Sequence, residues 1–174
     1  MAVNILAIVQ ARMGSTRFPG KVLKKVNGKP LIEILFHRLS LSKRIDKIIL
    51  ATSQNLKNDP LTKVVKKLGF DVFRGSEENV LKRYYEAAKL YNPGAVVRVT
   101  GDCPIIDPEV VDEVITLFEQ ENVDYACNIN PPTYPDGLDT EIFTFAALEQ
   151  ANRDAQKFYE REHVTPYMRS NRHF

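Results

Sequence analysis

The sequence predicts an α/β fold in which a mostly parallel sheet is covered by helices on both faces. Strand-like and helix-like segments alternate along the chain, which favours parallel strands joined by helical crossovers. The strand-like segments are apolar on both sides, as a sheet that is buried on both faces requires. The chain has 174 residues, and domains usually contain about 100–200. We therefore expect a single domain over residues 1–174.

Six segments are expected to form the strands. Each is a short run with apolar or β-branched residues between loop residues. The strands are expected at residues 3–10, 47–52, 70–74, 95–100, 123–128 and 138–145.

Helices are expected between these strands. In residues 30–42 the apolar side chains recur on one helical face. An Asp-Pro pair at 59–60 begins a second helix, which Gly69 ends, and another Asp-Pro pair at 107–108 begins a helix that runs to about residue 120. Ser76 is expected to cap the helix that follows it. Further helical segments follow the last strand.

Composition and charge exclude several classes of protein. The residues are 44% hydrophobic and 26% charged, with a net charge of +2, which is too balanced to indicate nucleic-acid or membrane binding. No apolar run approaches the ~18 residues of a membrane span, and the N-terminus is typical of a strand, not of a signal peptide. Cys103 and Cys127 are expected to be reduced thiols. We therefore expect a cytoplasmic protein.

The loops that follow the parallel strands are expected to form the binding site. Ligands of such sheets lie beyond the carboxyl ends of the strands, so the loops at 11–20, 52–58, 74–79 and 100–107 should converge. The first of them follows a strand in the segment AIVQARMGSTRFPGKVL and contains two arginines, a lysine and two glycines. Such a loop suits a polyphosphate, although it matches neither GxxxxGK[ST] nor GxGxxG. The alternative is a solvated basic surface loop.

The order of several motifs resembles one enzyme family. The pattern Ala-Arg-x-Gly-Ser-Thr-Arg-x-Pro-Gly-Lys after the first strand resembles sugar nucleotidyltransferases, above all the cytidylyltransferases that activate acidic keto-sugars (acylneuraminate and 3-deoxy-manno-octulosonate). The segments FRGSEENVLKRYYEAA, VRVTGDCPIIDPE, PDGLDTEIF and EREHVTPY resemble the branch of the spore-coat polysaccharide biosynthesis protein F. The resemblance implies a three-layer α/β/α nucleotide-diphospho-sugar transferase fold with a Rossmann-like sheet.

The resemblance also implies roles for the first loop and for Asp102. Asp102 follows the fourth strand in TGDCP, where the family holds Mg²⁺, and Mg²⁺ needs few protein ligands besides phosphates and water. The alternative for Asp102 is a helix cap, a role that Asp107 already fills. The residues expected to hold the triphosphate are Arg12, Arg17 and Lys21 by charge, and Gly14, Ser15 and Thr16 by close approach or hydrogen bonding.

Recognition of the cytosine base is implied for two segments. The first contains Gln10 and Ala11, and the second contains Gly75, Ser76 and Arg83. Two alternatives stay open, because Ser76 is equally explained as a helix cap and Arg83 as a surface residue of a helix.

The sugar is expected to bind in the second half of the chain. Asp139 and Glu141 are two residues apart, so in a strand they face the same side. Histidine side chains in general titrate near neutral pH, which makes His163 a candidate base, but a helix-packing histidine is the alternative. Cys103 is expected to be a small buried residue, not a nucleophile. The expected sugar-binding residues are Asp136, Asp139, Glu141, Arg161, Glu162 and His163.

The expected reaction is transfer of CMP from CTP to an acidic keto-sugar, with release of pyrophosphate, in surface or spore-coat polysaccharide biosynthesis. Two alternatives remain: a glycosyltransferase that uses a nucleotide sugar, and a non-catalytic nucleotide-binding module. Relatives usually continue into a further strand with an Asp-Thr-Pro-Glu-Asp-like segment, and this chain, which stops at SNRHF, is expected to lack it. A homodimer is expected from the resemblance alone.

Overall fold

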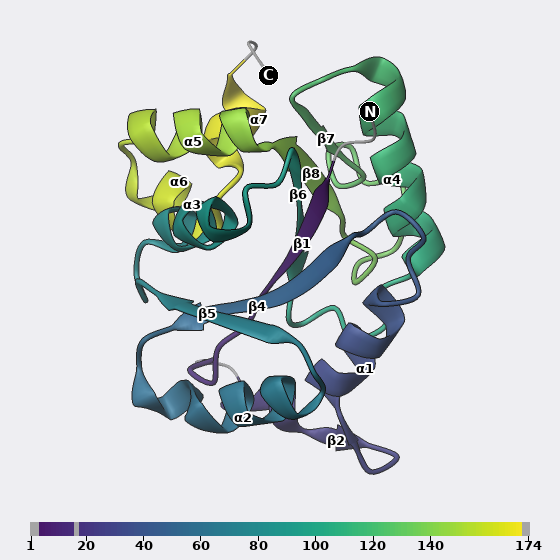
Figure 1. The fold of residues 1–174 in the computed structure, drawn as a ribbon, viewed down its shortest axis with the longest axis vertical. Helices are drawn as coiled ribbons and strands as arrows, with labels where there is room; N and C mark the ends of the chain where they lie inside the picture. The colour runs from purple at the N-terminus through teal and green to yellow at the C-terminus, as the bar shows by residue number, and fades with distance from the viewer. Residues whose placement is uncertain (1–3, 16–17, 172–174) are drawn as a thin grey trace.

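A computed structural model describes residues 4–15 and 18–171. One six-stranded sheet crosses the molecule in the order β5-β4-β1-β6-β8-β7 (Figure 1). The first four strands in this order are parallel, β8 is antiparallel to β6, and β7 is antiparallel to β8. The strands are β1 (Ile5–Gln10), β4 (Lys47–Ser53), β5 (Asp71–Gly75), β6 (Ala95–Thr100), β7 (Tyr125–Cys127) and β8 (Glu141–Thr144).

Helices cover both faces of the sheet and complete the expected three layers. One face is covered by α1 (Leu31–Leu39), α2 (Asp59–Lys67) and α4 (Pro108–Glu121). The other face is covered by α3 (Val80–Tyr91), α5 (Phe145–Asp154), α6 (Phe158–His163) and α7 (Pro166–Ser170) (Figure 1). In the described part of the chain, no helix is long and apolar enough to cross a membrane.

Four short elements lie outside these layers or connect them. A two-stranded hairpin of β2 (Lys25–Val26) and β3 (Lys29–Pro30) follows the 3-10 helix η1 (Lys21–Leu23). The 3-10 helix η2 (Leu56–Asn58) precedes α2. None of these was expected from the sequence, because two- or three-residue elements leave no periodic pattern.

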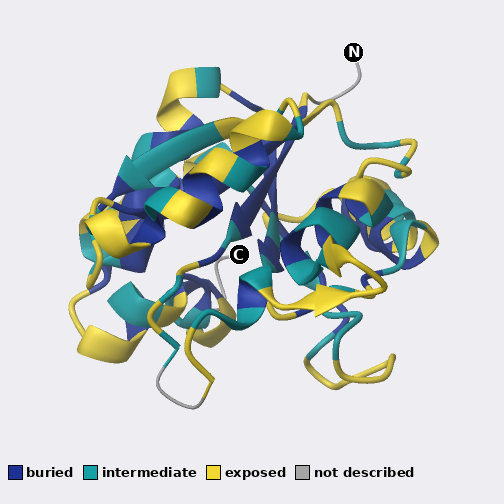
Figure 2. Cartoon of the chain, turned by 90° about the horizontal axis from the view of Figure 1, so that it is seen from below, coloured by how far each residue is buried: buried dark blue, intermediate teal, exposed yellow. Residues whose placement is uncertain are grey.

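The alternation of side chains in β1 divides the core into two halves. Leu6 and Ile8 pack toward α3 and α5, whereas Ala7 and Val9 pack toward α1, α2 and α4. All four are buried, and the central strands are mostly dark blue in Figure 2. This two-sided burial is what the continuous apolar run of the sequence indicated.

The expected helix boundaries are confirmed at two points and wrong at one. Gly69 follows α2 with φ +89°, and the Asp107 side chain accepts a hydrogen bond from the Glu109 N–H at 2.9 Å as the cap of α4. Ser76 does not cap α3. Its hydroxyl accepts a hydrogen bond from the Asn79 N–H at 3.0 Å, and Asn79 caps the helix by accepting from the Lys82 N–H at 2.9 Å.

The last strand is shorter than expected, which changes the interpretation of two carboxylates. β8 begins at Glu141, so Asp139 lies in the preceding loop and not in a strand. The expectation that Asp139 and Glu141 share one face of a strand is therefore wrong. Glu141 itself is buried, whereas Asp139 is partly exposed.

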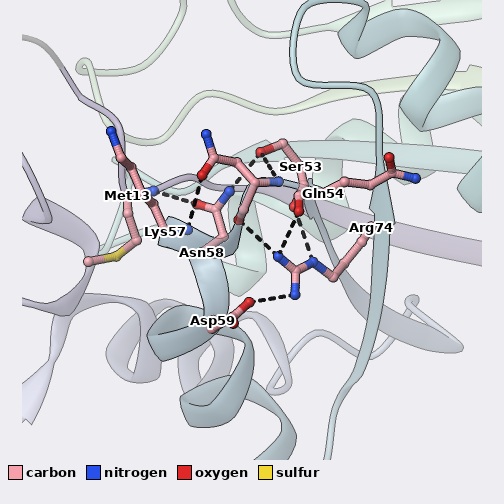
Figure 3. Close-up of polar contacts among 8 residues, drawn as sticks. Met13, Ser53, Gln54, Lys57, Asn58, Asp59 and Arg74 are labelled. Atoms are coloured by element: carbon pink, nitrogen blue, oxygen red, sulfur yellow. Dashed lines mark hydrogen bonds and ion pairs between the residues drawn. The ribbon is translucent and has the colours of Figure 1, made fainter.

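The first loop is anchored to the segment after β4 by a buried asparagine (Figure 3). The Asn58 amide oxygen accepts a hydrogen bond from the Met13 N–H at 2.8 Å, and its nitrogen donates to the Ser53 hydroxyl at 2.7 Å. Arg74 stiffens the same segment by donating to Asp59 at 2.6 Å and to the carbonyl oxygen of Asn55 at 2.8 Å. The segment at 52–58 therefore supports the first loop from behind.

Candidate active site

A cavity of about 660 Å³ opens beyond the carboxyl ends of β1 and β6. The first loop, α3 and α6 form its walls. This is the crevice that the parallel topology predicts, although the segment at 52–58 supports the site without lining it. The lining residues are Gln10, Ala11, Arg12, Ser15, Lys21, Val22, Glu77, Glu78, Val80, Arg83, Arg98, Thr100, Gly101, Asp102, Phe158, Glu162 and His163.

The structure brings many of the sequence-predicted residues together in this cavity, but not all of them. Those that line it are Gln10, Ala11, Arg12, Ser15, Lys21, Arg83, Asp102, Glu162 and His163. Those outside the lining are Gly14, Gly75, Ser76, Asp136, Asp139, Glu141 and Arg161. Thr16 and Arg17 lie outside the described residues.

Lys21 and Asp102 meet at the edge of the cavity. The Lys21 ammonium donates a hydrogen bond to Asp102 at 2.8 Å, although 81 residues separate them in the sequence. The Asp102 side chain is 51% exposed. Burial raises the pKa of the Asp102 carboxyl, but hydrogen bonds from Lys21 and Thr100 outweigh it and hold the pKa below its ordinary value. Asp102 is therefore ionised at neutral pH.

Arg83 is a buried cation that lines the cavity, and no carboxylate in the described part of the chain is bound to it. It is 3% exposed, and it donates to the carbonyl oxygen of Ser76, while its Nε has no hydrogen-bond partner within the described residues. Burial lowers the pKa of this guanidinium, and the nearby charge of Arg12 lowers it further. The alternative of a surface helix residue is wrong, because the side chain points inward.

Gly75 allows Arg83 to occupy this position. A Cβ at Gly75 would lie 2.9 Å from the Arg83 Cγ and 2.8 Å from the Phe73 ring. Gly75 is therefore explained by packing, because only a residue without a side chain lets Arg83 and Phe73 lie this close to the backbone.

Positive and negative groups occupy different parts of the cavity: arginines lie at its floor and carboxylates at its solvent-exposed rim. The floor of the cavity is formed by the guanidiniums of Arg83, which is buried, and Arg98, whose side chain is 14% exposed. The lining carboxylates of Glu77, Glu78 and Glu162, like that of Asp102, are exposed or partly exposed. Glu141 balances the charge of Arg98, so the charge of Arg83 is the one that favours an anionic ligand, because burial strengthens the interaction of charges.

The residues of the segment EREHV make different contacts, and not all of them face the cavity. Glu160 is buried and caps α6 by accepting hydrogen bonds from the Gln156 and Lys157 N–H groups at 3.1 and 3.0 Å. Arg161 donates to the carbonyl oxygens of Asn152 and Ala155, at 3.0 and 2.6 Å, and so ties α6 to the end of α5. The structure therefore places Arg161 away from the cavity and gives it a supporting position.

Glu162 and His163, in contrast, are presented to the cavity at the end of α6. Val164 follows them with φ +71° and ψ −57°, and the Thr165 N–H donates to the His163 carbonyl oxygen at 2.9 Å. This is a classic γ-turn, which is rare and strained for a β-branched residue. Burial of Val164 in the core stabilises this strained conformation. The turn ends α6 at His163, which lies against the cavity.

Three aspartates act electrostatically on Cys103: Asp102 of the cavity lining, and Asp136 and Asp139 outside the lining. Burial raises the pKa of the Asp139 carboxyl, and the charges of Asp136, Glu141 and Asp102 raise it further. Burial also raises the pKa of the Cys103 thiol, and the same aspartates add to the effect. The thiol is 5% exposed and stays protonated, as expected for a small buried residue.

Glu141 is corrected from a sugar-binding residue to a buried partner of the cavity floor. It is 2% exposed and forms an ion pair with Arg98. Its other oxygen accepts a hydrogen bond from the Tyr125 hydroxyl at 2.6 Å. Both oxygens are thus occupied, so Glu141 has no free edge to offer a ligand.

Comparison with known proteins identifies the family. A family model described as "Cytidylyltransferase" matches residues 6–174. The chain belongs to the cytidylyltransferase family. It is therefore a nucleotidyltransferase, and the family match favours nucleotidyl transfer over the glycosyltransferase alternative.

Related sequences are found in bacteria and archaea. An uncharacterized protein of Methanocaldococcus jannaschii is 42% identical over 169 residues, covering 97% of this chain and 68% of the relative. The spore coat polysaccharide biosynthesis protein SpsF of Bacillus subtilis is 39% identical over 173 residues, covering 97% and 71%. An 8-amino-3,8-dideoxy-manno-octulosonate cytidylyltransferase of Shewanella is 36% identical over 124 residues, covering 68% and 49%.

Solved structures confirm the fold. A cytidylyltransferase from Leptospira borgpetersenii superimposes with a TM-score of 0.88 at 36% identity, covering 98% of this chain and 72% of that one. A CMP:2-keto-3-deoxy-manno-octonic acid synthetase complexed with CTP superimposes with a TM-score of 0.73 at 17% identity, covering 95% and 84%. At that identity the second likeness concerns the fold alone.

Eight lining residues of this cytidylyltransferase were not predicted from the sequence: Val22, Glu77, Glu78, Val80, Arg98, Thr100, Gly101 and Phe158. Two of them, Arg98 and Gly101, leave a signal in the sequence. Arg98 is a charged residue inside the apolar strand AVVRVT, where a cation needs a partner or a purpose. Gly101 follows directly in TGD, and a Cβ there would lie 2.6 Å from the Ala11 Cβ and 3.1 Å from the Gln10 carbonyl oxygen. The Gly101 N–H donates to that oxygen at 2.8 Å, so the loops after β1 and β6 touch at this point.

Gly101→Ala is expected to damage both loops at once, because the added methyl forces the ends of β1 and β6 apart. The free energy of unfolding should fall by about 1–3 kcal/mol, the usual cost of overpacking, and nucleotide affinity should fall with it. Urea denaturation measures the first effect. Gly14→Ala is the stability control, since nothing lies within 4 Å of a Cβ there. Equal stability of both variants would contradict the close contact.

Asp139→Asn is expected to raise the melting temperature at pH 7. The pKa of Asp139 in the folded state lies above its ordinary value of 3.8. Protonated Asp139 therefore stabilises the folded state, and this stabilisation is lost as the pH rises through the folded-state pKa. The increase in melting temperature of Asp139→Asn over the wild type should therefore become smaller as the pH is lowered toward 3.8. Thermal unfolding as a function of pH measures it.

Asp154→Asn is the control of opposite sign for this measurement. A hydrogen bond from Arg153 lowers the pKa of the exposed Asp154 carboxyl, so the amide should bring no stabilisation at pH 7. An unchanged or lower melting temperature for Asp139→Asn would show that the neighbouring carboxylates do not repel one another.

Proposed function

We propose that this cytidylyltransferase transfers CMP from CTP to an acidic keto-sugar and releases pyrophosphate. The family match supports nucleotidyl transfer, and the names of two relatives point to a surface polysaccharide and to an acidic octulosonate sugar. A role in surface or spore-coat polysaccharide biosynthesis is part of the proposal.

One observation about the site supports a triphosphate most directly. Arg83 is buried and forms an ion pair with no carboxylate of the described residues, and it lies near Arg12 as well as near the exposed Glu77. Two cations held close together in a partly buried site destabilise each other until an anion binds between or beside them. Lys21 and Ser15 line the same cavity. Several hydrogen-bond donors are therefore available there to bind the successive phosphate groups of a triphosphate.

The reaction asks the protein to position groups and to neutralise charge. A hydroxyl of the sugar attacks the α-phosphorus, the bond to the bridging oxygen breaks, and pyrophosphate leaves with the electron pair. Arg12, Lys21 and Ser15 would hold the phosphates in line with the attacking oxygen. Positioning and charge neutralisation of this kind account for most of the catalysis in phosphoryl-type transfers.

Asp102 fits a Mg²⁺ ion that binds together with the triphosphate. Within the described residues no group of three or more His, Cys, Asp or Glu side chains could hold a metal alone. Mg²⁺ commonly uses one or two carboxylates with substrate phosphates and water, and Asp102 is ionised, half exposed and adjacent to the basic first loop. The ion would polarise the α-phosphate and neutralise its charge.

Binding of nucleotides by calorimetry tests the proposal. CTP, UTP, ATP and GTP are titrated with Mg²⁺ present, followed by an assay of pyrophosphate release with a panel of sugar acids. We expect CTP to bind more tightly than the other three and at least one sugar acid to release pyrophosphate. CTP binding without turnover on any sugar would favour the non-catalytic module, and no triphosphate binding would contradict the proposal.

Asp102→Asn is expected to abolish turnover, with a loss of at least about 100-fold in kcat, because the amide cannot hold the metal against the phosphates. Stability should change by less than about 1 kcal/mol, since Asp102 forms an exposed ion pair. Pyrophosphate release and urea denaturation measure the two effects.

Asp107→Asn is the matched control in the same loop. Asn also caps helices, and Asp107 lies outside the cavity lining. Turnover should therefore stay close to that of the wild type. Near-normal turnover of Asp102→Asn would exclude Asp102 as the metal ligand.

A further inference from the structure

Arg98 stands in the middle of a buried strand and faces the cavity. It lies opposite Ile8 of β1 and Glu141 of β8 in the sheet register. Its neighbours Val97 and Val99 pack on the other face of the sheet, so Arg98 faces the side of α3 and α6. The side chain is 14% exposed and forms part of the cavity lining.

Glu141 and Tyr125 hold Arg98 in place. The Arg98 Nη1 donates to one oxygen of Glu141, and the Tyr125 hydroxyl donates to the other at 2.6 Å. Burial lowers the pKa of Arg98, but the charge of Glu141 outweighs it, so the pKa is raised and the guanidinium stays charged. A buried ion pair adds little stability compared with well-packed apolar residues, which indicates a purpose other than stability.

One edge of the Arg98 guanidinium is left free. Its Nε–H is fully buried and has no hydrogen-bond partner among the described residues, and the protein accepts no hydrogen bond from Nη2 there either. Buried donors are normally paired. The Nε and Nη2 donors lie in the guanidinium plane along one of its edges, and such an edge can bind the two oxygens of a carboxylate.

The two arginines of the floor face different parts of the cavity. Arg83 lies near Arg12 of the first loop, where phosphates are proposed to bind. Arg98 lies on β6, next to β8 in the sheet, on the face that α6 covers with Glu162 and His163. Glu141 already balances the charge of Arg98. Arg98 would therefore bind an anionic ligand mainly through its directed N–H donors, and less through net charge.

We propose that Arg98 is a specificity-determining residue that binds the carboxylate of the acceptor sugar through its Nε and Nη2 edge. Glu141 and Tyr125 are the positioning residues that hold the guanidinium at the cavity. This proposal rests on the proposed function, because it assigns the acidic group of the acceptor to a particular side chain.

The test separates binding from folding with three variants. Arg98→Met alone leaves Glu141 buried without a partner and is expected to destabilise the protein. The triple variant Arg98→Met, Tyr125→Phe, Glu141→Leu removes every polar partner together and should melt within a few degrees of the wild type. Arg98→Lys keeps the charge but lacks the planar edge. Arg153→Met, at a side chain that is 69% exposed, is the control.

The measurements are CTP affinity by calorimetry and KM and kcat for 3-deoxy-manno-octulosonate, N-acetylneuraminate and their methyl esters. In the triple variant and in Arg98→Lys we expect CTP affinity within about twofold of the wild type. KM for the acids should rise about 10- to 100-fold, as for loss of a hydrogen bond between charged groups. The preference for acid over ester should disappear in both variants, while Arg153→Met keeps it.

An unchanged KM and an unchanged preference for acid over ester in both variants would overturn the proposal, and so would a wild-type enzyme that binds CTP but uses or binds no sugar acid. That second result would leave CTP binding itself supported. Failure of the wild type to bind CTP would overturn the proposed function and with it the assignment of Arg98.

Discussion

The hydrogen bond between the Gly101 N–H and the Gln10 carbonyl oxygen is the constraint on which the site depends. It closes the space between β1 and β6 where both strands end, and no side chain fits between them. The loop with Arg12 leaves from one strand and the loop with Asp102 from the other. Their closeness makes it possible for Lys21 to reach Asp102 across 81 residues of sequence.

Two kinds of support keep the charged groups of the cavity in place. The first loop is held from outside the cavity, since Met13 is bonded to the buried Asn58 (Figure 3). The floor is held by two contacts: Glu141 of β8 pairs with Arg98 of β6 within the sheet, and the carbonyl oxygen of Ser76, in the loop after β5, accepts a hydrogen bond from Arg83 of α3. A preorganised arrangement of this type reduces the reorganisation that a charged ligand would otherwise require.

Much of this arrangement could be predicted from the sequence, because its signals are local. The apolar runs of the four parallel strands, the Asp-Pro helix starts and the basic first loop each depend on neighbouring residues. The pairing of Arg98 with Glu141 depends on the register of an antiparallel strand 43 residues away, which no local pattern encodes. The cap of α3 was misplaced for a related reason: Ser76 and Asn79 are equally good caps, and the start of the helix at Val80, which packs into the core, decides between them.

The direction of β8 has a consequence for how this enzyme can vary. Because β8 runs against its neighbour β6, its first residue, Glu141, lies near the ends of the parallel strands, and the segment before it, with Asp136 and Asp139, borders the cavity. That segment connects two strands at an edge of the sheet and contributes little to the core. Insertions and replacements there would leave the loops that follow β1 and β6 in place, so the shape and charge of this side of the cavity can change independently of the first loop.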